Sequence, residues 1–317
     1  MLGAMTAVSP ADTGTIPARR PAAYRLTGLA LAVAAVLAFS VRPLLIKLGY
    51  GYGADPVTLL GLRMAFSLPF FLAIGAWLAR DAAQPAVSRN DLWAVGALGF
   101  LGYYLASFLD FTGLQYVTAG VGRLLLFLYP TIVVVLSALF LRKPIGRREV
   151  ASLVLTYGGV ALVLSGSMGG GNTNLPLGAA LIIGSAAAYA VYLVAGSRVI
   201  PRVGSMRFTA WATTVACVLC IAQFLVLRPL SALDLPWQVF ALSAVMAVVS
   251  TVLPIFMTAE ALKRIGANHV ALVGALGPVS AIGLGHVGLD ESLSLLQGLG
   301  SVLVLGGVLL VSLKPGK

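Results

Sequence analysis

The sequence predicts an all-α membrane protein with ten transmembrane helices, arranged as two inverted five-helix repeats. The composition, the spacing of apolar segments and an internal repeat support this prediction. Of the 317 residues, 59% are hydrophobic and only 10% are charged, whereas a typical soluble domain is about 25% charged. Because a membrane-spanning helix takes about 20 residues, the chain has room for about ten spans and none for a sizeable soluble domain.

Ten apolar runs lie between breaks formed by charged residues, Gly and Pro. They predict helices at residues 26–48, 57–79, 92–111, 118–141, 149–166, 177–197, 207–228, 236–258, 267–288 and 293–313. Residues 1–24 are rich in Pro, Ala, Thr and Arg, and we expect them to form a disordered cytoplasmic tail. The first repeat then covers 25–166, an external linker covers 167–176, and the second repeat covers 177–314.

The positive charges alternate with the predicted spans. The formal net charge is +11, and sixteen of the 21 Lys and Arg residues fall in segments on one side of the predicted bundle. The loops on the other side contain only Lys47 and Arg228. Cytoplasmic loops are enriched in Lys and Arg, so both termini are predicted to be cytoplasmic and the protein to reside in the inner membrane. The charge therefore reports topology and not nucleic-acid binding.

An internal repeat appears when the chain is shifted by 148 residues without gaps. Leu114 then superposes on Leu262, Ala119 on Ala267 and Pro130 on Pro278, and the Gly-Gly pair at 158–159 superposes on 306–307. Five spans per copy is an odd number, so the copies enter the membrane in opposite orientations. This is the inverted-repeat plan of many secondary transporters.

Several motifs resemble the EamA domain of the drug/metabolite transporter superfamily. In the first half they are DP at 55–56 with RMAF at 63–66, LLLFLYP at 124–130 with LRKP at 141–144, and YGGV at 157–160. In the second half they are AEAL at 259–262, LGP at 276–278, DESL at 290–293 and GGV at 306–308. The resemblance implies two tandem EamA units, a central cavity and export of amino acids or other small metabolites. The first half has RKPI at 142–145 where the second has the acidic turn at 290–293.

Three arginines within the predicted spans are the candidate substrate ligands. Arg42, Arg63 and Arg123 all fall in the outer halves of their spans, with one carboxylate, Asp110, nearby. A charge near the bilayer centre is costly, so such residues are functional candidates, and guanidinium groups match carboxylate or phosphate. We therefore expect an anionic or zwitterionic small molecule as substrate. The alternative is that the arginines snorkel to the headgroups and bind nothing.

Two pairs at the tips of predicted hairpins are candidates for gates or for proton coupling. Asp110 and Arg123 flank the outer turn between spans three and four, and Glu260 and His269 flank the inner turn between spans eight and nine. A carboxylate in a low dielectric can carry a coupling proton. The alternative is that Asp110 and Glu260 are solvated interfacial residues.

Aromatic residues and prolines within the spans complete the set of candidates. Tyr103, Tyr104 and Tyr189 are candidates to line the cavity, with packing as the alternative. Pro130 and Pro278 lie at matching depths and are hinge candidates, because proline frees a backbone carbonyl and kinks a helix.

The remaining reactive residue types predict no metal site and no cofactor. His269 and His286 are the only histidines, and no carboxylate or thiol clusters with them. Cys217 and Cys220 lie within an apolar run, where we expect two small apolar thiols.

These features favour a monomeric secondary transporter that exports amino acids or related carboxylates by alternating access. No Walker motif, HExxH or Ser/His constellation is present, so neither ATP coupling nor an intramembrane enzyme is expected. A metabolite importer, a drug exporter of the same fold and a passive channel remain as alternatives.

Overall fold

The structure is a computed structural model, which describes residues 22–79, 87–141, 145–167, 173–274, 276–291 and 294–312. Throughout these residues the elements are helical and no strand occurs. They are α1 Ala22–Ser40, α2 Arg42–Gly51, α3 Pro56–Ala79, α4 Arg89–Gly99, η1 Phe100–Leu105, α5 Ala106–Gly113, α6 Ala119–Leu126, α7 Tyr129–Leu141, α8 Arg147–Gly166, α9 Leu175–Val203, α10 Ser205–Leu227, η2 Leu230–Leu233, α11 Trp237–Ala247, η3 Val248–Val252, α12 Leu253–Gly274, α13 Leu276–Leu289 and α14 Leu295–Ser312.

The helices form the predicted membrane bundle. Within the described ranges, eight helical stretches are long and apolar enough to cross a bilayer, and two shorter apolar helices lie in α13 and α14. Their outer surface exposes large apolar side chains such as Leu139, Phe140 and Val226. Trp77, Trp93 and Trp237 are more than 60% exposed near the ends of their helices, as is typical of side chains at the membrane–water interface.

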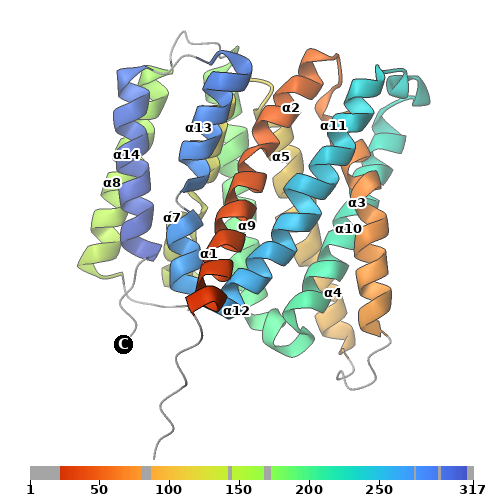
Figure 1. Ribbon diagram of the computed structural model, residues 1–317, viewed down its shortest axis with the longest axis horizontal. Coiled ribbons are helices and arrows are strands. Elements are labelled where there is room, and N and C mark those ends of the chain that lie inside the picture. Colours follow the sequence, from red (N-terminus) through yellow and green to blue (C-terminus); the bar gives the residue numbers. More distant parts are fainter. Residues whose placement is uncertain are drawn as a thin grey trace, which may run out of the picture.

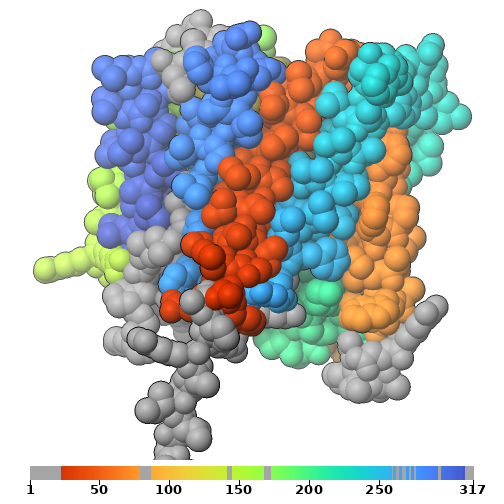
Figure 2. All heavy atoms as spheres, in the orientation of Figure 1, coloured from red at the N-terminus to blue at the C-terminus, as the bar shows by residue number. Residues whose placement is uncertain are grey.

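Helix packing follows a pseudo-two-fold axis that relates the two repeats. The second span, α3, packs on the seventh, α10, and the fifth, α8, packs on the tenth, α14. The remaining pairs are exchanged by the same symmetry: α1 packs on α12, while α5 and η1 pack on α9. Figures 1 and 2 show α1 on one face between α12 and α13.

The two ends of the described chain show that the total number of crossings is even. The start of α1 and the end of α14 lie on the same side of the bundle, at the bottom of Figure 1. Ten antiparallel segments divided into two equal repeats place the start of the second repeat on the opposite side. The repeats are therefore inverted.

Close packing between the repeats depends on glycine where α8 crosses α14. A methyl group at Gly159 would lie 2.7 Å from the Gly300 carbonyl oxygen, and one at Gly307 would lie 2.9 Å from the Ser152 carbonyl oxygen. Neither helix backbone could approach the other so closely with a larger residue at these positions. The repeated Gly-Gly pair thus supplies one small residue from each repeat to this crossing.

The predicted boundary between the eighth and ninth spans differs from the structure. A turn was expected near residues 259–266, between the eighth and ninth spans, but the helix α12 continues to Gly274. The end of α12 thus covers 267–274, which correspond at the 148-residue offset to α6, Ala119–Leu126. α13, with 14 residues, forms the longer second part of the ninth span.

Candidate substrate site

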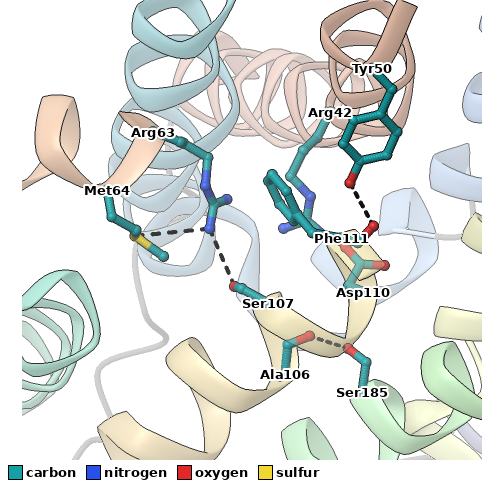
Figure 3. A network of polar contacts seen from close by, with 9 residues as sticks. All are labelled: Arg42, Tyr50, Arg63, Met64, Ala106, Ser107, Asp110, Phe111 and Ser185. Carbon is teal, nitrogen blue, oxygen red and sulfur yellow. Dashed lines mark hydrogen bonds and ion pairs between the residues drawn. The ribbon is translucent and has the colours of Figure 1, made fainter. Parts of the chain in front are cut away.

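Arg42 begins α2 at an interruption of the first span. Pro43 follows it, and proline cannot donate the backbone hydrogen bond that would continue α1. The Arg42 Nη2 atom lies 3.0 Å from Asp110 Oδ2 on α5, and the two side chains are 17% and 5% exposed. This ion pair therefore lies in the interior of the bundle, where Figure 3 shows both side chains.

Arg63 on α3 faces the same region but meets neutral groups. Its residue is 2% exposed, and its Nη2 atom donates to Ser107 Oγ at 3.2 Å. Its guanidinium carbon lies 4.9 Å from the centre of the Phe111 ring, within the range of a cation–π interaction. Figure 3 shows the Phe111 ring between Arg63 and Arg42. Successive residues of α5 thus contact different arginines: Asp110 pairs with Arg42, and Phe111 packs on Arg63.

Arg123 on α6 has neither a carboxylate partner, as Arg42 has, nor a hydroxyl partner, as Arg63 has, among the described residues. In the part of the chain that the structure describes, its side chain makes no hydrogen bond or ion pair. Its Nη2 atom would lie 3.4 Å from a methyl group at Gly277 of α13, so the glycine leaves space for the arginine. Arg42 and Asp110 both act on it electrostatically, as do Tyr129 and Tyr189.

The site therefore has an excess of positive charge. Three guanidinium groups share one carboxylate, and the Nε atom of each arginine is buried without a hydrogen-bond acceptor among the described residues. Buried cations that lack a partner are destabilising, so such residues mark binding or transport pathways in membrane proteins. The arrangement can attract an anion and offer it several N–H donors.

An aromatic cluster adjoins Arg123. The ring centres of Tyr129 and Tyr189 are 5.2 Å apart, and Tyr189 stacks on Tyr192 at 5.6 Å. Tyr192 donates to the Tyr103 hydroxyl at 3.2 Å, and Tyr103 belongs to the π-helical segment η1. Isolated π-helical turns occur frequently at functional sites. Tyr189 and Tyr103 thus belong to one cluster near the arginines.

Tyr104 lies apart from these rings. It packs on Phe100 at 5.3 Å and contacts the main hydrophobic core. Tyr103 and Tyr104 are adjacent in sequence and were both candidates to line the cavity, but in the structure they contact different groups of side chains.

Asp110 and Glu260 each form an ion pair with an arginine outside the proposed gate pairs. Asp110 pairs with Arg42 and not with Arg123, because the break before α2 brings Arg42 to α5. Glu260 pairs with Arg264 at 2.9 Å, one turn along α12. His269 is exposed, and its Nδ1 atom lies 2.8 Å from the Ile265 carbonyl oxygen.

Only one of the two proline candidates follows a helix break within the described residues. α6 ends at Leu126 and α7 starts at Tyr129, so Pro130 falls in the first turn of α7. Pro278 lies in α13, two residues after Leu276, and the residue before Leu276 lies outside the described residues. Proline is tolerated in the first turn of a helix, where its missing N–H is not needed.

Glu291 makes a contact that the sequence alone did not suggest. Its Oε1 atom accepts from Ala119 N at 2.6 Å and its Oε2 atom from Gly120 N at 3.1 Å. The acidic turn of the second repeat thus caps α6, the helix of the first repeat that carries Arg123. A small pocket beside this contact is lined by Thr118, Gly120, Val121, Leu124, Ile282, Glu291 and Gln297. The only sequence signal was the acidic turn itself.

No metal centre is formed by the described side chains, since no three of their His, Cys, Asp and Glu residues gather closely enough to hold an ion. Cys217 and Cys220 are free and buried in α10, and the Cys217 sulfur lies 3.6 Å from that of Met64.

A polytopic helical bundle with inverted repeats and unpaired interior cations defines a membrane transporter, and comparison with known proteins agrees. The EamA-like transporter family model matches residues 26–165 and 176–313, so the chain belongs to the EamA-like transporter family of the drug/metabolite transporter superfamily. The two matched segments coincide with the two repeats.

Relatives and a solved structure support the same assignment. The chain is 32% identical to the "Uncharacterized transporter YcbK" of Bacillus subtilis (strain 168), covering 88% of this chain and 91% of the relative. It is 26% identical to the "Uncharacterized transporter sll1319" of Synechocystis sp. (strain ATCC 27184 / PCC 6803 / Kazusa), covering 80% and 78%. A solved crystal structure with 20% identity has the same fold, with a TM-score of 0.62 over 92% of this chain and 98% of that one.

Proposed function

We propose that this transporter is a monomeric secondary carrier that exports small carboxylate-bearing metabolites, such as amino acids, across the inner membrane. The observation that supports an anionic or zwitterionic substrate is the interior excess of arginine over carboxylate. Guanidinium groups with unused N–H donors in a low dielectric bind carboxylates strongly. The substrate would bind among Arg42, Arg63 and Arg123, beside the tyrosine cluster.

Alternating access is supported by the inverted repeats, which carry the π-helical segments η1 and η3 at matching positions. Inverted repeats that rock around a fixed site expose it to each side of the membrane in turn. In this proposal the helices bend near Pro130 and Pro278, which lie at equivalent positions of the two repeats. Replacing either proline by Ala should slow substrate exchange and leave equilibrium binding unchanged, since the hinge does not touch the substrate.

The orientation of the proposed carrier follows from its charges. Sixteen basic residues belong to one side by sequence, and both described ends of the chain lie on one side of the bundle. We therefore place both termini in the cytoplasm. Labelling of cysteines introduced at the two ends would test this orientation.

Asp110 and Glu260 remain the candidates for a coupling proton, and their ion pairs with Arg42 and Arg264 suggest how they could also act as gates. His269 is proposed at the same gate as Glu260. Transport driven by an imposed pH gradient should depend on at least one of the two carboxylates. A gradient response that survives both D110N and E260Q would exclude this coupling.

The central experiment is counterflow in liposomes that contain the purified protein. A panel of labelled amino acids and organic acids would be tested for saturable exchange, which a channel does not show. R63Q and R123Q should each weaken transport of the responsive substrate about 30-fold, as expected when a buried charge loses its partner. R198Q is the matched control, because Arg198 is exposed at the end of α9. Unchanged kinetics in both interior variants would reject the proposed site.

A further inference from the structure

We propose that the interior site selects substrates that carry two negative charges when bound, such as dicarboxylates or phosphate monoesters. The inference rests on the proposed function and narrows its substrate class. The argument depends on how the charges of five neighbouring residues are distributed: Arg42, Arg63, Asp110, Phe111 and Arg123.

The first step is that one of the three arginines is already neutralised. Arg42 and Asp110 lie 3.0 Å apart in the interior, and together they carry no net charge. An anionic substrate therefore gains little from Arg42 unless it displaces Asp110. Arg63 and Arg123 are therefore the two arginines that remain available to bind the substrate.

The second step is that Arg63 and Arg123 have only neutral surroundings at contact distance. Arg63 donates to the Ser107 hydroxyl and packs on the face of Phe111. Arg123 makes no hydrogen bond or ion pair among the described residues, and Gly277 leaves space beside it. Both retain a buried Nε–H without an acceptor. Two positive charges without a carboxylate partner thus remain among the described residues of the bundle interior.

The third step concerns geometry. Asp110 and Phe111 are successive residues of α5, and they contact Arg42 and Arg63 respectively. Arg63 comes from α3 and Arg123 from α6, on elements that both pack against α5 and α2. Arg63 and Arg123 therefore approach the Arg42–Asp110 pair from two different helices. A substrate with two anionic groups would satisfy both, whereas a monoanion would leave one cation buried and unpaired.

The experiment compares ligands that differ only in charge. The full-length protein, purified in detergent, is titrated with the dicarboxylates from malonate to adipate and with the monoamide of each. Binding is measured by thermal stabilisation, and competition is measured in the counterflow assay. We expect at least one dicarboxylate to bind about 30-fold more tightly than its own monoamide. Glycerol 3-phosphate and glycerol form a second matched pair.

A phosphate monoester also allows the charge to be changed without changing the skeleton. Its second ionisation has a pKa of about 6, so it becomes a dianion between pH 5 and pH 7. If it is a ligand, its affinity relative to that of sulfate, which stays dianionic, should rise over this range. Selective binding by dicarboxylates alone would identify two separate carboxylates as the ligand chemistry, and selective binding by the monoester alone would identify phosphate.

Variants test whether the two excess arginine charges cause the preference for a dicarboxylate over its monoamide. R63Q or R123Q lowers the excess from two to one, so each should bring the affinities of dicarboxylate and monoamide to within about threefold. R63K keeps the charge and should keep the preference. R42Q/D110N replaces an ion pair without net charge by two neutral side chains. It should therefore keep the ratio of dicarboxylate to monoamide affinity, even if both affinities change. R198Q controls for the loss of an exposed arginine.

The outcomes separate this inference from the function on which it rests. If monoamides bind as tightly as dicarboxylates, or if R63Q and R123Q keep the preference, the dianion inference is wrong while a carboxylate carrier still stands. If no carboxylate, phosphate ester or amino acid of any charge binds or exchanges, the proposed function itself is wrong.

Discussion

The third span of the first repeat and its counterpart in the second repeat, the eighth span, are irregular at the same place. η1 starts at Phe100 and η3 starts at Val248, which are 148 residues apart. The fourth span is broken after Leu126, and the residue 148 positions later is Gly274, after which Ala275 lies outside the described residues. Pro254 follows η3, but no proline follows η1, so proline alone does not cause the π-helical turn. The backbone irregularities therefore belong to both repeats.

The charges of the interior do not follow this symmetry. Arg42, Arg63, Arg123 and Asp110 all belong to the first repeat, and the residues 148 positions later are Ala190, Trp211, Ala271 and Thr258. The comparison separates two roles of the repeated fold. Bending at matched positions needs both copies, whereas an anion site needs only one, since a second set of arginines would repel the first.

The largest effect that can test the symmetry is expected at the α8–α14 crossing. G159A and G307A should each destabilise the protein by about 1–3 kcal/mol, because the added methyl group meets the backbone of the partner helix. The thermal midpoint in detergent would measure this. G158A and G306A are matched controls, since nothing lies within 4 Å of a methyl group at either position. Similar losses from the control pair would contradict the crossing described here.

A smaller effect is expected where the repeats differ. E291Q removes charge from a carboxylate that accepts two hydrogen bonds from the start of α6, and we expect a loss of about 2 kcal/mol. The first repeat has no carboxylate at 142–145 that could form an equivalent cap. If the capped form is one end of the transport cycle, E291Q should also shift substrate exchange.

The neighbouring residue supplies the control for that prediction. D290N removes the same charge from an exposed side chain, and Asn tolerates the positive φ of 51° at this position. Its thermal midpoint should stay close to that of the unmodified protein. An equal loss in D290N and E291Q would mean that loop charge, and not the cap, stabilises this end.

The smallest effect is expected at an ion pair on the opposite side. Arg202 on α9 and Asp91 on α4 join the repeats at 2.6 Å, but the arginine side chain is 57% exposed. Exposed ion pairs contribute little to stability. R202Q should therefore leave the thermal midpoint unchanged at physiological salt. A clearly lower midpoint would show that contacts between the repeats stabilise both ends of the bundle.

Much of the fold could be predicted because hydropathy is a local property. The length of each apolar run reflects the thickness of the bilayer, and the 148-residue repeat with an odd number of spans implies inversion. The predicted turn at 259–266 was wrong, because this segment contains charged and polar residues that are compatible with both a turn and a continuing helix.

The candidate site was only partly predictable. The three arginines and Asp110 stood out because charge within an apolar run is costly, and Pro130 and Pro278 stood out through the repeat. The pairing of Asp110 with Arg42 could not be predicted, because Arg123 is closer to Asp110 in sequence, across the turn between α5 and α6. Phe111, Ser107 and Glu291 carried no comparable signal, since each is an ordinary residue in its own segment.

By itself the sequence determined the helical segments, the inverted repeat and the presence of surplus positive charge inside the membrane. Each of these follows from residue type and spacing along the chain. Only the tertiary structure decided which arginine is neutralised and which helix Glu291 caps. These contacts join residues 68 and 172 positions apart, and their geometry depends on the helix breaks and crossings that bring distant segments together.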